Sequence, residues 1–102
     1  MVKAKSYKEH LLKQLRDPKE AAAYLNAAIY DEDPHVFLLA LRDIAEAKGG
    51  MGWLADEADL NRENLYRTLS LKGNPRFFNL LAVLDAVGLE FSIHARPKRG
   101  RA

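Results

Sequence analysis

The chain has 102 residues, of which 48% are hydrophobic and 29% are charged, and its formal net charge is only +2. This is one domain's worth of an ordinary globular composition, and it excludes a protein that binds nucleic acid through bulk positive charge alone. Without cysteine there are no disulfides, thiolate zinc sites or cysteine nucleophiles. The sequence contains neither an apolar run of about 20 residues, as a membrane span requires, nor the apolar region of a signal peptide, so we expect a cytoplasmic protein.

Helix-start signals recur along the chain. Ser6 and Glu9 have the spacing of a capping box. At three later points an N-cap residue precedes a proline, which fits the first helical position because its missing N–H would have no intrahelical partner: Asp17-Pro18, Asp33-Pro34 and Asn74-Pro75. Together with the apolar periodicity, these signals predict helices at about 6–16, 18–31, 34–48, 51–58, 61–70 and 75–87.

Apolar residues recur at spacings of three, four and seven within these segments, which indicates one buried stripe on each helix. Glycines end two of them: Gly49 and Gly50 follow the third helix, and Gly88 suits the left-handed position after the last. The clearest stripes are Ala22, Leu25 and Ile29; Leu38, Leu41 and Ala45; and Phe77, Leu80, Leu81 and Leu84.

The stretch from Leu89 to Ala95 breaks the helical pattern. Leu89, Phe91 and Ile93 alternate with polar residues, which predicts a short β-strand with one buried face. No second strand is predicted elsewhere, so its backbone would need the same strand of a second subunit around a two-fold axis. The alternative is an extended tail laid on the helices.

The last residues, 96–102, form a basic tail without apolar anchors. We expect this tail either to be solvated or to add contacts to DNA phosphates after the rest of the protein has docked. Residues 1–95 are then expected to form a single helical domain that carries an N-terminal helical extension. The two helices of this extension either hold a partner protein or only complete the core.

The segment from Met51 to Ser70 has the pattern of a helix-turn-helix. Ala55 is the small residue that lets the two helices cross closely, and it stands ten residues before Leu65, as the motif requires. Asn61 supplies the N-cap of the second helix. The pattern therefore predicts an all-α fold of five to six helices that contains a helix-turn-helix, with the short C-terminal β-strand in addition.

Two positions depart from this pattern. Asp59 stands in the turn where glycine is favoured, because one residue there must take a positive φ; aspartate tolerates that conformation better than most residues. Thr68 stands where an apolar residue is usual.

The N-terminal part of the second helix of such a motif enters the major groove of DNA. Arginine can pair with guanine, asparagine with adenine and glutamate with cytosine, while other cations meet phosphates. Glu63 and Arg67 could instead form an ion pair at i,i+4. The predicted DNA-binding residues are Asn61, Arg62, Glu63, Tyr66, Arg67, Ser70, Lys72 and Arg76.

Acidic residues weigh against DNA binding. Asp56, Glu57 and Asp59 lie late in the first motif helix and in the turn, where they can face away from the groove. Because they weaken non-specific affinity, a helical protein-interaction module without DNA binding remains the alternative function. A gel shift with the protein's own upstream DNA over a salt series separates the two.

Other chemistry has little support in the sequence. The three histidines are far apart and have no metal-ligand spacing, and "KGGMG" matches neither nucleotide-binding glycine pattern, so we expect no metal, no cofactor and no enzyme activity. The single tryptophan, Trp53, either caps the core or lies at a binding surface.

Four stretches resemble the addiction-module antidote proteins, a branch of the phage-repressor-like (Xre-type) helix-turn-helix superfamily. They are "LRDPKEAAAYLNAAIYDEDP", "DPHVFLLALRDIAEAKGGM", "LADEADLNRENLYRTLSLKGNP" and "FFNLLAVLDAVGLEFSI", and they cover nearly the whole chain. The resemblance implies an antitoxin that neutralises a co-encoded toxin of the RelE/ParE-like fold and represses its own operon. It also implies a homodimer that binds operator DNA.

Overall fold

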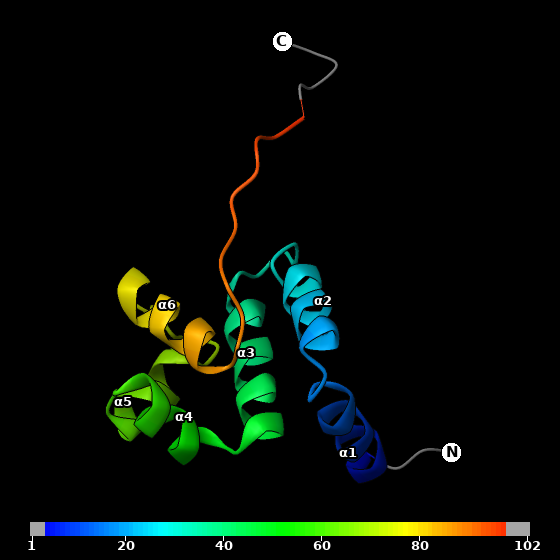
Figure 1. Cartoon of the computed structure of the whole chain (residues 1–102), viewed down its shortest axis with the longest axis vertical. Coiled ribbons are helices and arrows are strands. Elements are labelled where there is room, and N and C mark those ends of the chain that lie inside the picture. Colours follow the sequence, from blue (N-terminus) through cyan, green and yellow to red (C-terminus); the bar gives the residue numbers. More distant parts are fainter. Residues whose placement is uncertain (1–3, 98–102) are drawn as a thin grey trace.

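The computed structural model describes residues 4–97 and contains six α-helices in that range (Figure 1). All six predicted helices are present, so the prediction of a helical fold is confirmed. None of the described helices is long and apolar enough to cross a membrane. The helices are α1 (Ala4–Gln14), α2 (Pro18–Ala28), α3 (His35–Lys48), α4 (Met51–Ala58), α5 (Arg62–Thr68) and α6 (Phe77–Ala86).

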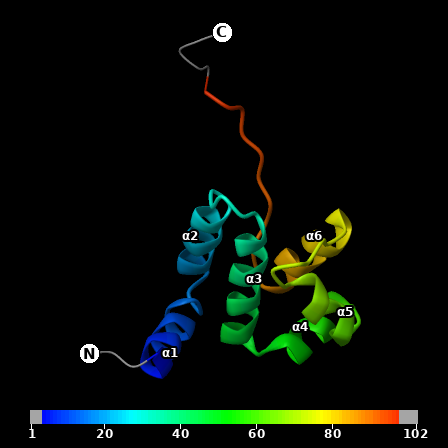
Figure 2. The same ribbon diagram turned by 180° about the vertical axis from the view of Figure 1, so that it is seen from behind.

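Helix α3 stands at the centre of the arrangement. Helices α1 and α2 pack along one side of it, while α4 leads to the other side, where α4 packs on both α5 and α6. Both views show this division, with α1–α2 and α4–α6 on opposite sides of α3 (Figures 1 and 2). The core consequently runs through α3 and joins the two sides.

The core takes residues from each of the predicted apolar stripes, but Ile29 and Phe77 were wrongly included in them, since these two side chains are 51% and 56% exposed. Leu41, Ile44 and Ala45 of α3 are completely buried, and Leu54 of α4 is equally inaccessible. Burying a leucine or isoleucine side chain stabilises a fold by roughly 1.5–3 kcal/mol. The other buried core residues are Leu15, Ala21, Leu25, Leu38, Ala40, Ala47, Met51, Ala55, Leu65, Leu69, Val83, Leu84 and Val87.

Two of the predicted helix starts have the expected side-chain caps. Asp17 Oδ1 accepts a hydrogen bond from the backbone N–H of Lys19 at 3.0 Å, directly before Pro18 at the first position of α2. At the start of α3, Asp33 Oδ1 accepts from the N–H of His35 at 2.9 Å. This bond, and a second one to the His35 side chain, lower the pKa of the Asp33 carboxyl. The Asp17-Pro18 pair therefore marks the start of α2 correctly, whereas α3 begins one residue later than predicted, with Pro34 in place of Asp33 as its N-cap.

The capping signals at the first and last helices were wrong in detail. Helix α1 begins before Ser6, so Ser6 and Glu9 are exposed residues inside the helix and form no capping box. Helix α6 begins only at Phe77, after an extended Arg76, so Asn74 does not cap it. At the start of α6 no side chain caps the helix.

The predicted C-terminal β-strand is wrong, because residues 4–97 contain no strand. From Glu90 to Pro97 the chain forms no backbone–backbone hydrogen bond with any described residue. Leu89 is half-buried, but Phe91 is 44% and Ile93 87% exposed. The alternating apolar residues share one face of the segment, but no neighbouring strand is present among the described residues to pair with it. The segment extends away from the helices (Figure 1).

The predicted basic tail at 96–102 is only partly described. Arg96 and Pro97 are exposed. Residues 98–102 lie outside the described residues.

A polar cluster ties the first two helices to α3. The Tyr24 hydroxyl of α2 donates to Asp43 Oδ2 of α3 at 2.7 Å, and Lys8 Nζ of α1 lies 3.2 Å from Glu46 Oε2 and 3.9 Å from Asp43 Oδ1. Burial, and then the hydrogen bond to Asp43, raise the pKa of Tyr24 well above its usual range. The hydroxyl therefore stays protonated and keeps donating.

Replacing Tyr24 by phenylalanine is expected to lower the free energy of unfolding by about 1 kcal/mol, because the Tyr24–Asp43 hydrogen bond is lost. Urea denaturation measures this difference. The matched control is Tyr30→Phe, since Tyr30 is 88% exposed and its hydroxyl has no partner among residues 4–97. Equal stabilities of the two variants would contradict the assigned role of Tyr24.

Candidate nucleic-acid interface

The turn between α4 and α5 fixes how α5 is presented. Asp59 adopts the left-handed conformation expected of it, with φ 55° and ψ 48°. The N–H of Leu60 then donates back to the carbonyl of Ala55 at 2.9 Å, which closes the end of α4. Asn61 is extended, and its Oδ1 accepts from the N–H of Asn64 at 3.0 Å. The prediction of Asn61 as the N-cap of this helix is confirmed.

Helix α5 has a buried face and an exposed face. Leu65 and Leu69 are buried against the core, together with Ala55 of α4. This burial fixes the rotation of α5, and most of the predicted DNA-binding residues point outward as a result. The exposed ones are Asn61, Arg62, Glu63, Tyr66 and Arg67 on the helix and its cap, and Lys72 and Arg76 in the loop that follows; Ser70 is half-buried.

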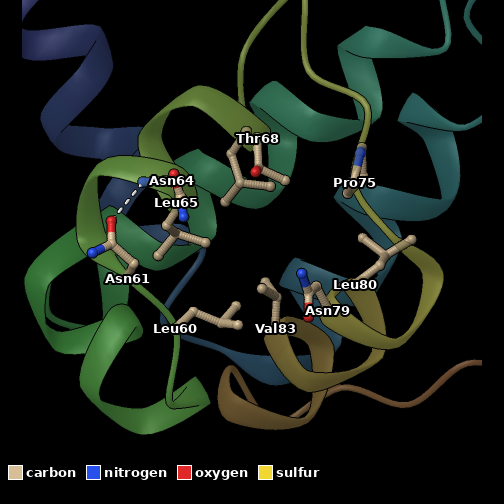
Figure 3. A pocket seen from close by; sticks show the side chains of 10 residues that line it. Leu60, Asn61, Asn64, Leu65, Thr68, Pro75, Asn79, Leu80 and Val83 are labelled. Carbon is tan, nitrogen blue, oxygen red and sulfur yellow. Dashed lines mark hydrogen bonds between the residues drawn. The ribbon is translucent and has the colours of Figure 1, made fainter.

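A shallow hollow separates α5 from α6 (Figure 3). It has a volume of about 70 Å³, and Thr68, the threonine where an apolar residue is usual, lines it beside Leu65 and Val83. Ligand pockets typically have volumes of roughly 300–1,000 Å³. The hollow is therefore too small to bind a nucleotide or a cofactor. The exposed face of α5 is the candidate binding surface in this part of the protein.

Three side chains meet on the exposed face of α5. The guanidinium carbon of Arg62 lies 5.9 Å from the centre of the Tyr66 ring, and that of Arg42 lies 5.1 Å from the same ring. Both distances fall within the range of cation–π contacts. Arg62 also lies against α4, since a Cβ added to Gly52 would stand 3.4 Å from its guanidinium carbon.

The predicted cations are not neutralised by neighbouring acids. Within residues 4–97, the ion pairs within 4.0 Å involve only Lys8 and His35 as cations. The alternative ion pair between Glu63 and Arg67 is therefore not formed. Asp56, Glu57 and Asp59 are exposed at the end of α4 and in the turn, and they too lack an ion-pair partner in the described part of the chain.

The loop after α5 has its own hydrogen bonds. The Ser70 hydroxyl donates to the carbonyl of Arg67 at 2.7 Å, and the N–H of Gly73 donates to the carbonyl of Ser70 at 3.0 Å. Ser70 therefore helps to end the helix. Lys72 and Arg76 are exposed, and their side chains form no hydrogen bond or ion pair with the other candidates in residues 4–97. Within the described part of the chain, the cation–π contacts with Tyr66 come from Arg42 and Arg62 and involve neither Lys72 nor Arg76.

Sequence reasoning missed Arg42. It belongs to α3, far from the motif in sequence, and it lies between the buried Leu41 and the half-buried Asp43. Its position off the apolar stripe was visible, but its contact with Tyr66 depends on how α3 and α5 pack.

Trp53 is half-buried beside the joint between α3 and α4. A Cβ added to Gly49 would come within 2.9 Å of the Trp53 ring, so this side chain covers the joint. It packs on the buried core. This contact favours the core-capping role of the two that were predicted for it.

Comparison with known proteins gives a consistent picture. The model of one protein family, described as "Probable addiction module antidote protein", matches residues 6–95 of the chain. An uncharacterized protein of Haemophilus influenzae is 36% identical over 85 residues, which make up 83% of this chain and 82% of that protein. No solved structure matches the chain.

Proposed function

Because the chain belongs to the family of probable addiction module antidote proteins, we propose that it is the antitoxin of a toxin–antitoxin module. An antidote implies a toxin as its partner, and the proposed toxin is a co-encoded RelE/ParE-like protein. The proposed antitoxin acts in the cytoplasm by binding, without enzymatic activity of its own.

The second proposed activity is repression of its own operon. In this proposal α4 and α5 form a lambda-repressor-like (Xre-type) helix-turn-helix that binds operator DNA. The observation that supports it best is the exposed face of α5, where Tyr66 is exposed and where Arg62 and Arg67 lack an ion-pair partner within residues 4–97. In such a motif the second helix enters the major groove.

The side chains have different proposed roles. Arg67 and Arg62 contact guanine or adjacent phosphates, and Glu63 accepts from cytosine. Asn61 uses its Oδ1 to cap α5, so its amide NH₂ is the group that remains free to donate to DNA. Tyr66 is proposed to contact a thymine methyl group or a phosphate, and Lys72 and Arg76 are proposed to contact phosphates. Ser70 is proposed to lie at the edge of the DNA-binding surface.

Fluorescence anisotropy with the DNA upstream of the protein's own gene tests this proposal. We expect tighter binding to this DNA than to unrelated DNA of equal length, at every salt concentration used. Non-specific binding arises from phosphates and weakens steeply with salt, so a preference that persists at high salt indicates base recognition. Equal affinity for both DNAs, or no binding, would contradict the proposed repressor.

The alternative is a helical protein-interaction module that has lost DNA binding. The exposed acids Asp56, Glu57 and Asp59, close to the proposed DNA-binding face, favour this alternative because they repel phosphates. A protein that binds its toxin and does not bind upstream DNA would match it. The same anisotropy titration therefore decides between the two functions.

We also propose a homodimer, formed through the apolar surface of α6 and the segment that follows it. Phe77 and Phe78 are 56% and 80% exposed, their ring centres are 5.8 Å apart, and Phe91 lies 6.2 Å from Phe77. Beside them a groove of about 310 Å³ is lined by α2, α3, α6 and Leu89–Ser92. Residues Leu89–Ser92 line this groove, and the chain continues beyond it. In the proposed dimer, the segment after α6 of each copy packs against the groove of the other copy, as two-fold symmetry requires.

Replacing Phe78 and Ile93 together by glutamate is expected to give a monomer, because charged side chains would be desolvated in the proposed interface. Light scattering at tens of micromolar measures the mass, with a dimer expected for the unchanged protein. Both residues are at least 80% exposed, so the fold of one protomer should survive. Tyr7→Glu on the distant α1 is the control and should remain dimeric. A monomeric unchanged protein would contradict the proposed dimer.

A further inference from the structure

We propose that Arg42 of α3 and Arg62 of α5, held by the ring of Tyr66, form a binding site for a phosphate group of the DNA backbone. This inference rests on the proposed operator binding and extends the DNA-binding surface to α3, which the helix-turn-helix pattern does not include. The ligand class is a phosphodiester anion that two guanidinium groups can share.

The first argument is the arrangement of charge. Both guanidinium carbons lie within 6 Å of the centre of the Tyr66 ring, at 5.1 and 5.9 Å, so two positive charges are gathered around one side chain. Within residues 4–97 no carboxylate lies within 4.0 Å of either group. Two guanidinium groups around one ring repel each other, and an anion bound by both would offset that repulsion.

The second argument is the supply of hydrogen-bond donors. Each guanidinium has five N–H donors, and neither Arg42 nor Arg62 donates a side-chain hydrogen bond to another described residue. A planar guanidinium can bind a phosphate through two parallel hydrogen bonds. The ring of Tyr66 restricts both side chains, which lowers the entropy that would be lost on binding.

The third argument is position. Tyr66 and Arg62 belong to the exposed face of α5, and Arg62 also lies against Gly52 near the start of α4. Arg42 extends from the middle of α3, next to the completely buried Leu41, so its backbone is held in the core. A phosphate bound here would lie beside the groove that α5 enters and would fix the protein's register on the duplex without reading sequence.

The test is a pair of salt titrations with Arg42→Gln, on upstream DNA and on unrelated DNA. Each phosphate contact contributes a slope of about −0.9 in log K against log salt. We expect Arg42→Gln to weaken binding to both DNAs by a similar factor. We also expect the slope to become less steep by about 0.9, the contribution of one phosphate contact. Arg16→Gln makes the same change of charge at an exposed position between α1 and α2, and it should leave affinity and slope unchanged.

Three other outcomes would overturn the site. An unchanged slope with a lower melting temperature would make Arg42 a packing residue. A loss confined to upstream DNA would make it a base contact. Binding of inorganic phosphate that is lost in Arg42→Gln, while DNA affinity and salt slope stay unchanged, would assign the site to free phosphate instead of DNA.

The Arg67→Ala variant separates this inference from the proposed function. If the unchanged protein binds neither DNA, both fail. If Arg67→Ala weakens operator binding while Arg42→Gln does not, the repressor stands and only the Arg42 site is wrong.

Discussion

Replacing Gly73 by alanine is expected to destabilise the fold by about 3 kcal/mol, the upper end of the usual cost of overpacking a well-packed interior. Gly73 is buried in the loop after α5. A Cβ at this position would lie 1.8 Å from the carbonyl oxygen of Thr68 and 2.7 Å from its carbonyl carbon. These are backbone atoms at the end of α5, so they cannot rotate away as a side chain would. The loop would have to open, and α5 would lose its anchored end.

Urea denaturation measures the cost, and a second glycine supplies the control. Gly52 is the second residue of α4, and the atoms nearest to a Cβ added there belong to the flexible end of Arg62, at 3.4 Å. Alanine is favoured over glycine in a helix by up to about 1 kcal/mol, so Gly52→Ala should be neutral or stabilising. Similar stabilities of Gly73→Ala and Gly52→Ala would mean that the loop after α5 adapts freely, contrary to its packing.

Replacing Arg67 by alanine is expected to weaken operator binding by about 1–3 kcal/mol, which is roughly five- to 150-fold. The reason is that Arg67 is exposed on α5 and forms no ion pair with Glu63, and that we propose it to bind guanine through two hydrogen bonds. Binding to unrelated DNA should change much less, because a base contact carries sequence information and a phosphate contact does not.

Anisotropy with upstream DNA measures this effect, and substitutions in the DNA sharpen it. If Arg67 reads one guanine, replacing that base pair should cost the unchanged protein about as much as Arg67→Ala costs, and the two changes together should cost little more. Arg16→Ala serves as the charge-matched control. Full operator affinity in Arg67→Ala would remove this residue from the recognition surface.

The sequence predicted those parts of the fold that depend on local signals. Asp17 and Asp33 bind the backbone N–H groups expected of them, and Asp59 takes the left-handed conformation, because each acts on residues only a few positions away. The apolar stripes predicted buried residues such as Leu25, Leu41 and Leu84 for the same reason, although Ile29 and Phe77 of the same stripes are exposed. The burial of Leu65 and Leu69 then fixed the outward residues of α5.

The failures have physical causes. The signal at Ser6 was wrong because a capping pattern does not prevent a helix from starting one turn earlier. The strand at Leu89–Ala95 was wrong because alternation describes one face of a segment and says nothing about a neighbouring strand. The cluster of Arg42, Arg62 and Tyr66 was missed because it depends on the packing of α3 against α5, which no local pattern encodes.

The central position of α3 has a consequence for local opening of the protein. Because α1 and α2 pack on one side of it and α4 on the other, either side can open without exposing all of α3. Amide hydrogens in regions that open only with global unfolding exchange slowest with solvent. The amides around Leu41 and Ile44 should therefore exchange last, and the two flanking groups of helices should form separate cooperative units that share α3.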